Sequence, residues 1–133
     1  MEKKLAETKR KDAKLARSLV KIAKERIKFF SSKEISVFTL EGYYEAILEV
    51  CHAFLALNGT KTISHECAIE FLRENGVLKS SDVEFLHQLR RRRHSIKYYG
   101  VAIRNDVLGK YVERAHRIFD ELVTKLEKEL QSK

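Results

Sequence analysis

Apolar side chains recur along this chain at the spacing of an α-helix, in five separate segments. Within each segment they fall every three or four residues, which places them on one face of a helix. The pattern predicts helices over residues 2–30, 39–58, 64–75 and 81–99, and from residue 106 almost to the end of the chain. The first apolar row thins before residue 13, where lysines dominate. Residues 1–12 are therefore expected to form a basic N-terminal extension that either frays or is simply a solvated continuation of the helix.

Residues with known preferences for helix ends mark the boundaries of these segments. Asn58-Gly59 and Asn75-Gly76 predict left-handed stops, and Gly100 ends the fourth segment. Ser64 is placed to cap the third helix, and Ser81-Asp82-Val83-Glu84 has the spacing of a capping box at the start of the fourth. Neighbouring residues on a helix do not face each other, so Ser64-His65 is not a catalytic dyad. A separate role for His65 stays open.

The composition agrees with a single helical domain. The chain has 133 residues, no proline, no tryptophan and five glycines, which favours long uninterrupted helices. This length supports one hydrophobic core. We predict an all-α domain over residues 1–133, an antiparallel up-and-down four-helix bundle with one additional short helix, the third, across one end.

The balance of charge indicates an acidic partner. Twenty-seven Lys and Arg residues face 19 Asp and Glu residues, for a formal net charge of +8, which favours nucleic acid or an acidic protein. The excess is concentrated in residues 3–28 and 90–97. For the first run we favour an ordinary solvated helix surface. Because the chain contains neither an apolar run of membrane-spanning length nor a signal peptide, a cytoplasmic protein with no membrane association is expected.

Two patterns that suggest metal or thiol chemistry have simpler explanations. Three Glu-x-x-His pairs have the spacing used by di-iron bundles: Glu49 with His52, Glu84 with His87, and Glu113 with His116. Each pair lies off its apolar row, which predicts polar side chains that face water, so we expect no metal and no cofactor. Cys51 and Cys67 lie on apolar faces without metal-ligand spacing and are expected to be packing residues.

Four consecutive arginines, residues 90–93, lie on the fourth predicted helix. Arg93 falls within the apolar arc of that helix, whereas Arg91, His87 and His94 point the other way. A charge on an apolar face needs compensation. We therefore expect Arg93 to be partly buried, facing Tyr98, a second subunit, a bound anion or a nearby carboxylate.

Basic and aromatic side chains gather at the end of the same helix. Charge, bidentate hydrogen bonds and stacking are the means by which proteins hold nucleotides and single-stranded RNA. The predicted nucleotide- or RNA-binding residues are Arg90, Arg92, His94, Lys97 and Tyr99, beside Arg93. Tyr44 and Tyr111 are predicted to pack in the core.

Several short motifs are arranged as in HEPN domains. Arg93-His94, followed by Tyr98 at the end of a helix, resembles the family's Arg-Asn/His-x-x-x-His/Tyr segment. Tyr43-Tyr44-Glu45-Ala46 and Leu55-Ala56-Leu57-Asn58-Gly59 resemble its second helix, and Thr62-Ile63-Ser64-His65 resembles its Ser-His helix start. The resemblance covers roughly residues 13–126. It is closest to the minimal HEPN proteins that accompany small nucleotidyltransferases of the MNT type.

The resemblance implies a homodimer and a functional role for Arg93 and Tyr98. HEPN nucleases bring an arginine and a histidine together at a dimer cleft and cleave RNA without metal. Here Tyr98 takes the histidine position, and a phenol with a pKa of about 10 accepts protons poorly near neutrality. We therefore expect a protein that acts with a nucleotidyltransferase partner in a toxin–antitoxin or nucleotide- or RNA-binding module. An RNA-cleaving toxin with Arg93 and Tyr98 as catalytic pair is one alternative, and a non-catalytic structural bundle is another.

Apolar surface also favours a dimer. The second and last predicted helices carry more apolar side chains than a small bundle needs. We expect them to contribute to a two-fold interface that places two copies of Arg93 near each other.

Overall fold

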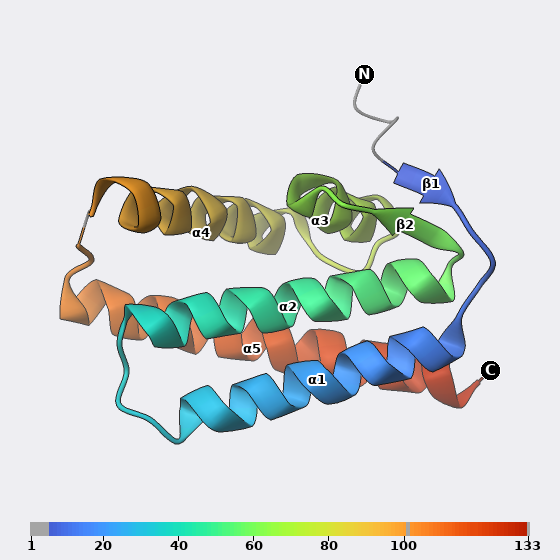
Figure 1. The fold of residues 1–133 in the computed structure, drawn as a ribbon, viewed down its shortest axis with the longest axis horizontal. Helices are drawn as coiled ribbons and strands as arrows, with labels where there is room; N and C mark the ends of the chain where they lie inside the picture. The colour runs from blue at the N-terminus through green and yellow to red at the C-terminus, as the bar shows by residue number, and fades with distance from the viewer. Residues whose placement is uncertain (1–5, 101, 133) are drawn as a thin grey trace.

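Over the residues that the structure describes, the fold consists of five helices and one two-stranded sheet (Figure 1). The computed structural model describes the backbone of residues 6–100 and 102–132, and the side chains in these ranges except at residues 6 and 97–99. The elements, in chain order, are β1 (Ala6–Thr8), α1 (Ala13–Ser31), α2 (Val37–Leu57), β2 (Thr60–Thr62), α3 (His65–Glu74), α4 (Ser80–Tyr99) and α5 (Asn105–Gln131). The predicted helical class is confirmed.

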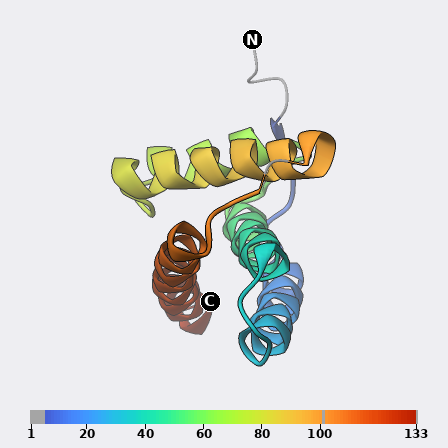
Figure 2. The same ribbon diagram turned by 90° about the vertical axis from the view of Figure 1, so that its left-hand side faces the viewer.

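The long helices α1, α2 and α5 lie side by side, and α4 crosses them. Figure 2 shows α1, α2 and α5 nearly end-on, whereas α4 runs across the view above α2 and α5. The antiparallel four-helix arrangement is therefore not confirmed, although α3 is short as predicted. In this crossing arrangement α4 buries Val83, Phe85, Leu86 and Leu89, and the crossing angle depends on the shapes of both packed surfaces.

The central helix of the fold is α2. It contacts α1, α3, α4 and α5, so it is buried on nearly all sides, as a helix with apolar residues around its whole circumference must be. Tyr44, Phe54 and Ile47 are among its fully buried side chains. The apolar residues of α5 that include Ile118, Leu122 and Leu126 are also buried within the chain. The apolar surface expected to form a dimer is thus used inside one subunit.

The N-terminal segment differs from the predicted helix. Helix α1 begins at Ala13, where Asp12 caps it by accepting a hydrogen bond from the Leu15 amide at 2.9 Å. Before it, β1 pairs antiparallel with β2. The Asp12 amide donates to the Ala56 carbonyl at 2.9 Å, which ties this segment to the end of α2. The prediction missed β1 because its backbone partners lie more than fifty residues away.

The helix stops are confirmed, but one helix start is not. Gly59, Gly76 and Gly100 have φ of 70°, 71° and 65°, the left-handed conformation that glycine adopts without strain. Ser64 caps α3, since its hydroxyl accepts from the Cys67 amide at 3.1 Å. By contrast, α4 begins at Ser80 with no side-chain cap.

The predicted capping box at Ser81 is therefore wrong, because α4 begins at Ser80 and Ser81 lies within its first turn. The acidic residue of that turn, Asp82, is buried and accepts hydrogen bonds from Arg114 and Arg117 at 3.3 and 3.2 Å. Arg114 also donates a hydrogen bond to the Ser81 carbonyl at 3.0 Å, which is a further contact between this turn and α5. The start of α4 is thus held by long-range ion pairs.

Candidate functional site

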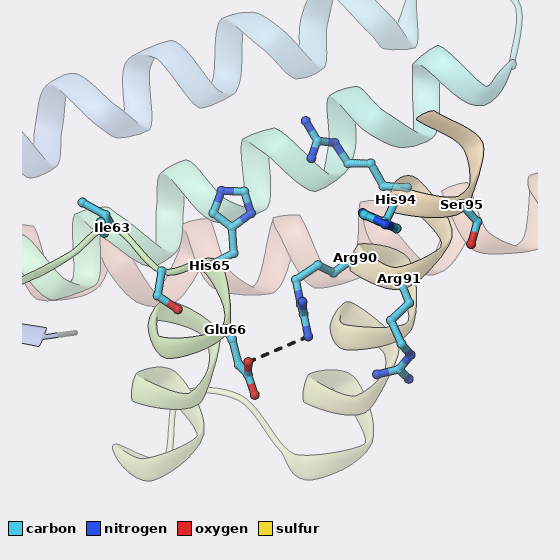
Figure 3. A pocket seen from close by; sticks show the side chains of 9 residues that line it. Ile63, His65, Glu66, Arg90, Arg91, His94 and Ser95 are labelled. Atoms are coloured by element: carbon cyan, nitrogen blue, oxygen red, sulfur yellow. Dashed lines mark ion pairs between the residues drawn. The ribbon is translucent and has the colours of Figure 1, made fainter. Parts of the chain in front are cut away.

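A cleft opens between the N-terminus of α3 and the C-terminal half of α4 (Figure 3). Its volume is about 740 Å³. The lining residues are Ile63, Ser64, His65, Glu66, Arg90, Arg91, Arg93, His94 and Ser95. Three arginines thus share one cavity with two histidines and a single carboxylate. Such a lining attracts anions, and the α3 N-terminus adds the positive end of a helix dipole.

Arg93 is partly buried, as its place in the apolar arc predicts. Its side chain is 31% exposed, and Nη2 lies 3.1 Å from Glu45 Oε2 on α2. The guanidinium also lies 5.9 Å from the centre of the Tyr44 ring. The compensating group is therefore a carboxylate, one of the candidates that the sequence left open. Arg93 Nε is buried without a hydrogen-bond partner among the described residues, so a ligand in the cleft could contact only the terminal nitrogens of this guanidinium.

The ion pair of Arg90 is longer than that of Arg93. Arg90 Nη2 lies 4.0 Å from Glu66 Oε1, at the limit of an ion pair, and the dashed line in Figure 3 marks this contact across the cleft. Within the described part of the chain, Arg90 Nε also has no hydrogen-bond partner. Arg91 is exposed at the rim and points away from His65. Arg90 and Arg93 thus keep terminal N–H donors that a bound phosphate could use.

His65 and His94 face the cleft from opposite helices (Figure 3). His65 Nδ1 lies 3.4 Å from the Tyr44 hydroxyl. Burial lowers the pKa of His65, and the positive charges of Arg93 and Arg90 lower it further, against the opposing effect of Glu45. Burial raises the pKa of the Tyr44 phenol, although the two arginines counteract it. Near pH 7 the imidazole of His65 is therefore neutral and can accept a proton.

Some predicted binding residues lie elsewhere. The Arg92 guanidinium lies 5.6 Å from the ring centre of Tyr111, which is partly buried, and Arg92 does not line the cleft. The side chains of Lys97, Tyr98 and Tyr99 fall outside the described residues. The sequence had not assigned Glu45 or Glu66 to this site, and it had left His65 open. The one available signal was the Ser64-His65 helix start, which fixes His65 in the first turn of α3.

The Glu-x-x-His pairs are engaged in separate contacts. Glu49 accepts two hydrogen bonds from Arg26, and His116 Nδ1 lies 2.7 Å from the Tyr43 hydroxyl. His87 is buried, with Nε2 2.7 Å from Glu70 Oε2, so the prediction that it faces water is wrong. It is covered because α3 packs against this face of α4. Among the described residues, no three His, Cys, Asp or Glu side chains are grouped to hold a metal ion.

The two cysteines contribute to packing within the fold. Cys51 is buried and Cys67 is partly buried, and both are free thiols. Burial raises the pKa of the Cys51 thiol to about 12, as expected of an inert packing residue. None of the helices, over the residues described, combines the length and apolarity needed to cross a bilayer.

Comparison of the chain with models of known protein families, with curated proteins and with solved structures finds no match.

Proposed function

We propose that the protein is a HEPN-like helical protein that binds the phosphate groups of RNA or a nucleotide in the cleft between α3 and α4. The observation that carries this proposal is the convergence of Arg90, Arg91 and Arg93 on one open cavity. Arg90 and Arg93 each contact one described carboxylate, at 4.0 and 3.1 Å, through a single terminal nitrogen. The other terminal N–H groups of each guanidinium can donate charge-assisted hydrogen bonds to a phosphate oxygen.

The ligand class follows from the shape of the site. The cleft is open and holds two histidines that can stack on a base or bond to it. Ile63, 86% exposed on the same rim, adds an apolar contact that a bare phosphate ion would not use. A nucleotide or a single-stranded RNA segment uses all three kinds of contact. We therefore favour these ligands over inorganic phosphate.

The partners in the proposal derive from the family resemblance. Minimal HEPN proteins accompany a nucleotidyltransferase and form homodimers, and we propose both partners for this chain. In that arrangement α1, α2, α4 and α5 would correspond to the four main helices of the HEPN bundle. Copurification with the product of a neighbouring nucleotidyltransferase gene, where one is present, examines this part without reference to RNA.

Binding to RNA is expected to weaken steeply with salt. Each phosphate that the cleft neutralises releases counterions, and three contacts correspond to a slope of about −2 in a plot of log affinity against log salt. The affinity for a fluorescent single-stranded RNA should then fall about 20-fold between about 50 mM and about 200 mM salt. Fluorescence anisotropy measures this dependence. An affinity that stays flat over this range would contradict phosphate binding.

A second candidate function, metal-independent RNA cleavage, is favoured by the presence of His65 beside the two arginines. The ribose 2′-oxygen would attack the adjacent phosphorus and the bond from phosphorus to the 5′-oxygen would break. His65 would take the 2′-hydroxyl proton, and the leaving oxygen would take a proton from water. Arg90 and Arg93 would stabilise the charge on the phosphorane. The products are a 2′,3′-cyclic phosphate and a 5′-hydroxyl.

For this second function, His65→Ala should slow the cleavage of bound RNA, measured at saturating protein, at least about tenfold. Cleavage by the unmodified protein should decline only as the pH falls below about 6.5, because a lowered pKa keeps His65 unprotonated above it. Denaturing gels follow the RNA, and an RNA with a single 2′-deoxy substitution serves as the uncleavable control. Cleavage that persists in His65→Ala, or that requires a metal ion, would exclude this mechanism. RNA that stays intact would leave binding as the function.

A further inference from the structure

Helix α1 carries a second row of apolar side chains that the fold does not cover. Its inner face packs against the core through Ala16, Val20, Ala23 and Ile27. On another face, Leu15, Ile22 and Phe29 are 47%, 47% and 56% exposed. They are spaced by seven residues, which is two helical turns, so they form one line along α1.

The surroundings of this line have the pattern of a coiled-coil seam. We call the outer seam the line together with Ser18, Glu25 and Ser32, the residues three positions further along the helix. One edge is basic throughout, because Lys14, Lys21 and Lys28 repeat with the same seven-residue spacing. The other edge carries Leu19 and Arg26, with Lys33 just beyond the end of α1. Arg26 is paired with Glu49, and Lys33 lies over the Phe29 ring. Lys14, Lys21 and Lys28 make no ion pair with any described carboxylate.

We propose that the outer seam of α1 binds an amphipathic helix of a partner protein that carries acidic residues beside its apolar row. Three exposed large apolar side chains in heptad register offer knobs for a helix packed along α1. The unpaired lysines at the edge select a negatively charged partner, because opposite charges at these positions set the choice of coiled-coil partner.

Charge argues against a second copy of this chain as the occupant. If two outer seams met in antiparallel orientation, the lysines of one copy would face the lysines of the other. In parallel orientation they would face Arg26 and Lys33. Like charges in these positions destabilise a pair of helices. A partner helix with acidic residues at its flanking positions would place carboxylates opposite these lysines in either orientation.

The width of the seam argues against a membrane surface. A helix that lies in a bilayer interface presents a broad apolar face, and the broad apolar face of α1 is turned to the core. The outer seam has one large apolar residue in each heptad, separated by polar Ser18, Glu25 and Ser32. Such a narrow line fits between the side chains of one helix.

The position of α1 leaves the cleft between α3 and α4 accessible. Figures 1 and 2 show α1 on one side of α2 and α4 on the other. A helix bound to the outer seam would therefore not block the arginines. The inference is independent of the proposed RNA or nucleotide binding, so either can fail without the other.

A pair of synthetic peptides tests the proposal. Both are labelled helices of three heptads with leucine in the seam, one with glutamate and the other with lysine at the flanking positions. We expect the acidic peptide to bind the full chain and the lysine peptide not to bind. Ile22→Ser should weaken acidic-peptide binding about tenfold, because the complex loses the burial of the exposed part of an isoleucine side chain. Replacing Lys14, Lys21 and Lys28 by glutamine should also weaken it and reduce its salt dependence.

Matched controls distinguish peptide binding at the outer seam from nonspecific hydrophobic binding elsewhere on the protein. Ile63→Ser removes an even more exposed isoleucine outside α1 and should leave peptide binding unchanged. Far-UV circular dichroism checks that each variant is folded, and RNA binding by Ile22→Ser should equal that of the unmodified chain. Equal binding of both peptides, no binding of the acidic one, or an equal effect of Ile22→Ser and Ile63→Ser would overturn the proposal.

Two further measurements address the other occupants. Binding to phosphatidylglycerol vesicles that is lost in Ile22→Ser, without binding of the acidic peptide, would assign the seam to a membrane. A dimer in sedimentation experiments that Ile22→Ser dissociates would assign it to a second copy. Either result would overturn the proposed protein partner.

Discussion

Replacing Arg90 and Arg93 together by alanine is expected to weaken the binding of single-stranded RNA by about 10²- to 10⁴-fold. Both side chains line the cleft, and each contacts one described carboxylate through a single terminal nitrogen, so further terminal N–H groups can donate to a phosphate. A hydrogen bond to a charged group contributes about 1.5–3 kcal/mol, so losing one at each arginine removes about 3–6 kcal/mol. Each 1.4 kcal/mol corresponds to about a tenfold change in affinity.

A charge-matched control decides whether the cleft or the net charge matters. The double replacement Arg10→Ala with Arg104→Ala removes the same charge from two exposed positions outside the cleft. It should reduce affinity only slightly, because surface charges are screened at physiological salt. If it weakens binding as much as the cleft variant does, the protein attracts RNA through its overall charge and the proposed site is wrong. Arg93→Lys should give an intermediate affinity, since lysine keeps the charge but not the bidentate geometry.

Asp82→Ala is expected to destabilise the fold by about 2–3 kcal/mol. The Asp82 side chain is 2% exposed, and its carboxylate joins the first turn of α4 to Arg114 and Arg117 on α5. Without it, the two arginines turn to solvent, because their side chains are already 39% and 42% exposed. The loss comes from the hydrogen bonds and from the small void left in the turn. Urea denaturation measures the change in the free energy of unfolding.

The natural control for this variant is Asp106→Ala. Asp106 is also the acidic residue in the first turn of its helix and also pairs with an arginine, Arg104 at 2.7 Å, but its side chain is 62% exposed. Exposed pairs of this kind contribute less than about 1 kcal/mol. Similar losses in the two variants would mean that the contribution of Asp82 does not come from its burial, because the position in the first turn and the arginine pair are features that both residues share.

The placement of Asp82 also connects stability with the candidate site. The first turn of α4 is tied to α5 by Asp82, and its middle is tied to α3 by the contact of His87 with Glu70. Hydrogen bonds from Arg73 and His87 lower the pKa of Glu70, although burial alone would raise it. These contacts hold α3 and α4 together below the cleft. The distance across the cleft from His65 to the arginines therefore depends on residues that contact no ligand.

Local patterns in the sequence determined the helices and three of their C-terminal stops, but not the starts of α1 and α4. The apolar periodicity identified all five helices of the described chain. Glycine adopts positive φ without strain, unlike other residues, so Gly59, Gly76 and Gly100 could be predicted as helix stops. Ser64 could be predicted as a helix cap because its partner, the Cys67 amide, is only three residues away in the chain. The partial burial of Arg93 followed from its angle on α4, since a helix fixes the angle of every side chain relative to its apolar face.

Tertiary structure alone decided the features that depend on partners far away in the chain. The pairing of β1 with β2, the burial of Asp82 between two helices and the covering of His87 by α3 all join segments that no local spacing connects. The crossing of α4 over α2 and α5 belongs to the same class, because helix packing depends on the shapes of both surfaces. That crossing brings the first turn of α3 beside the arginines. The sequence showed a row of cations and a separate histidine, and only the packing of α3 against α4 placed them in one cleft.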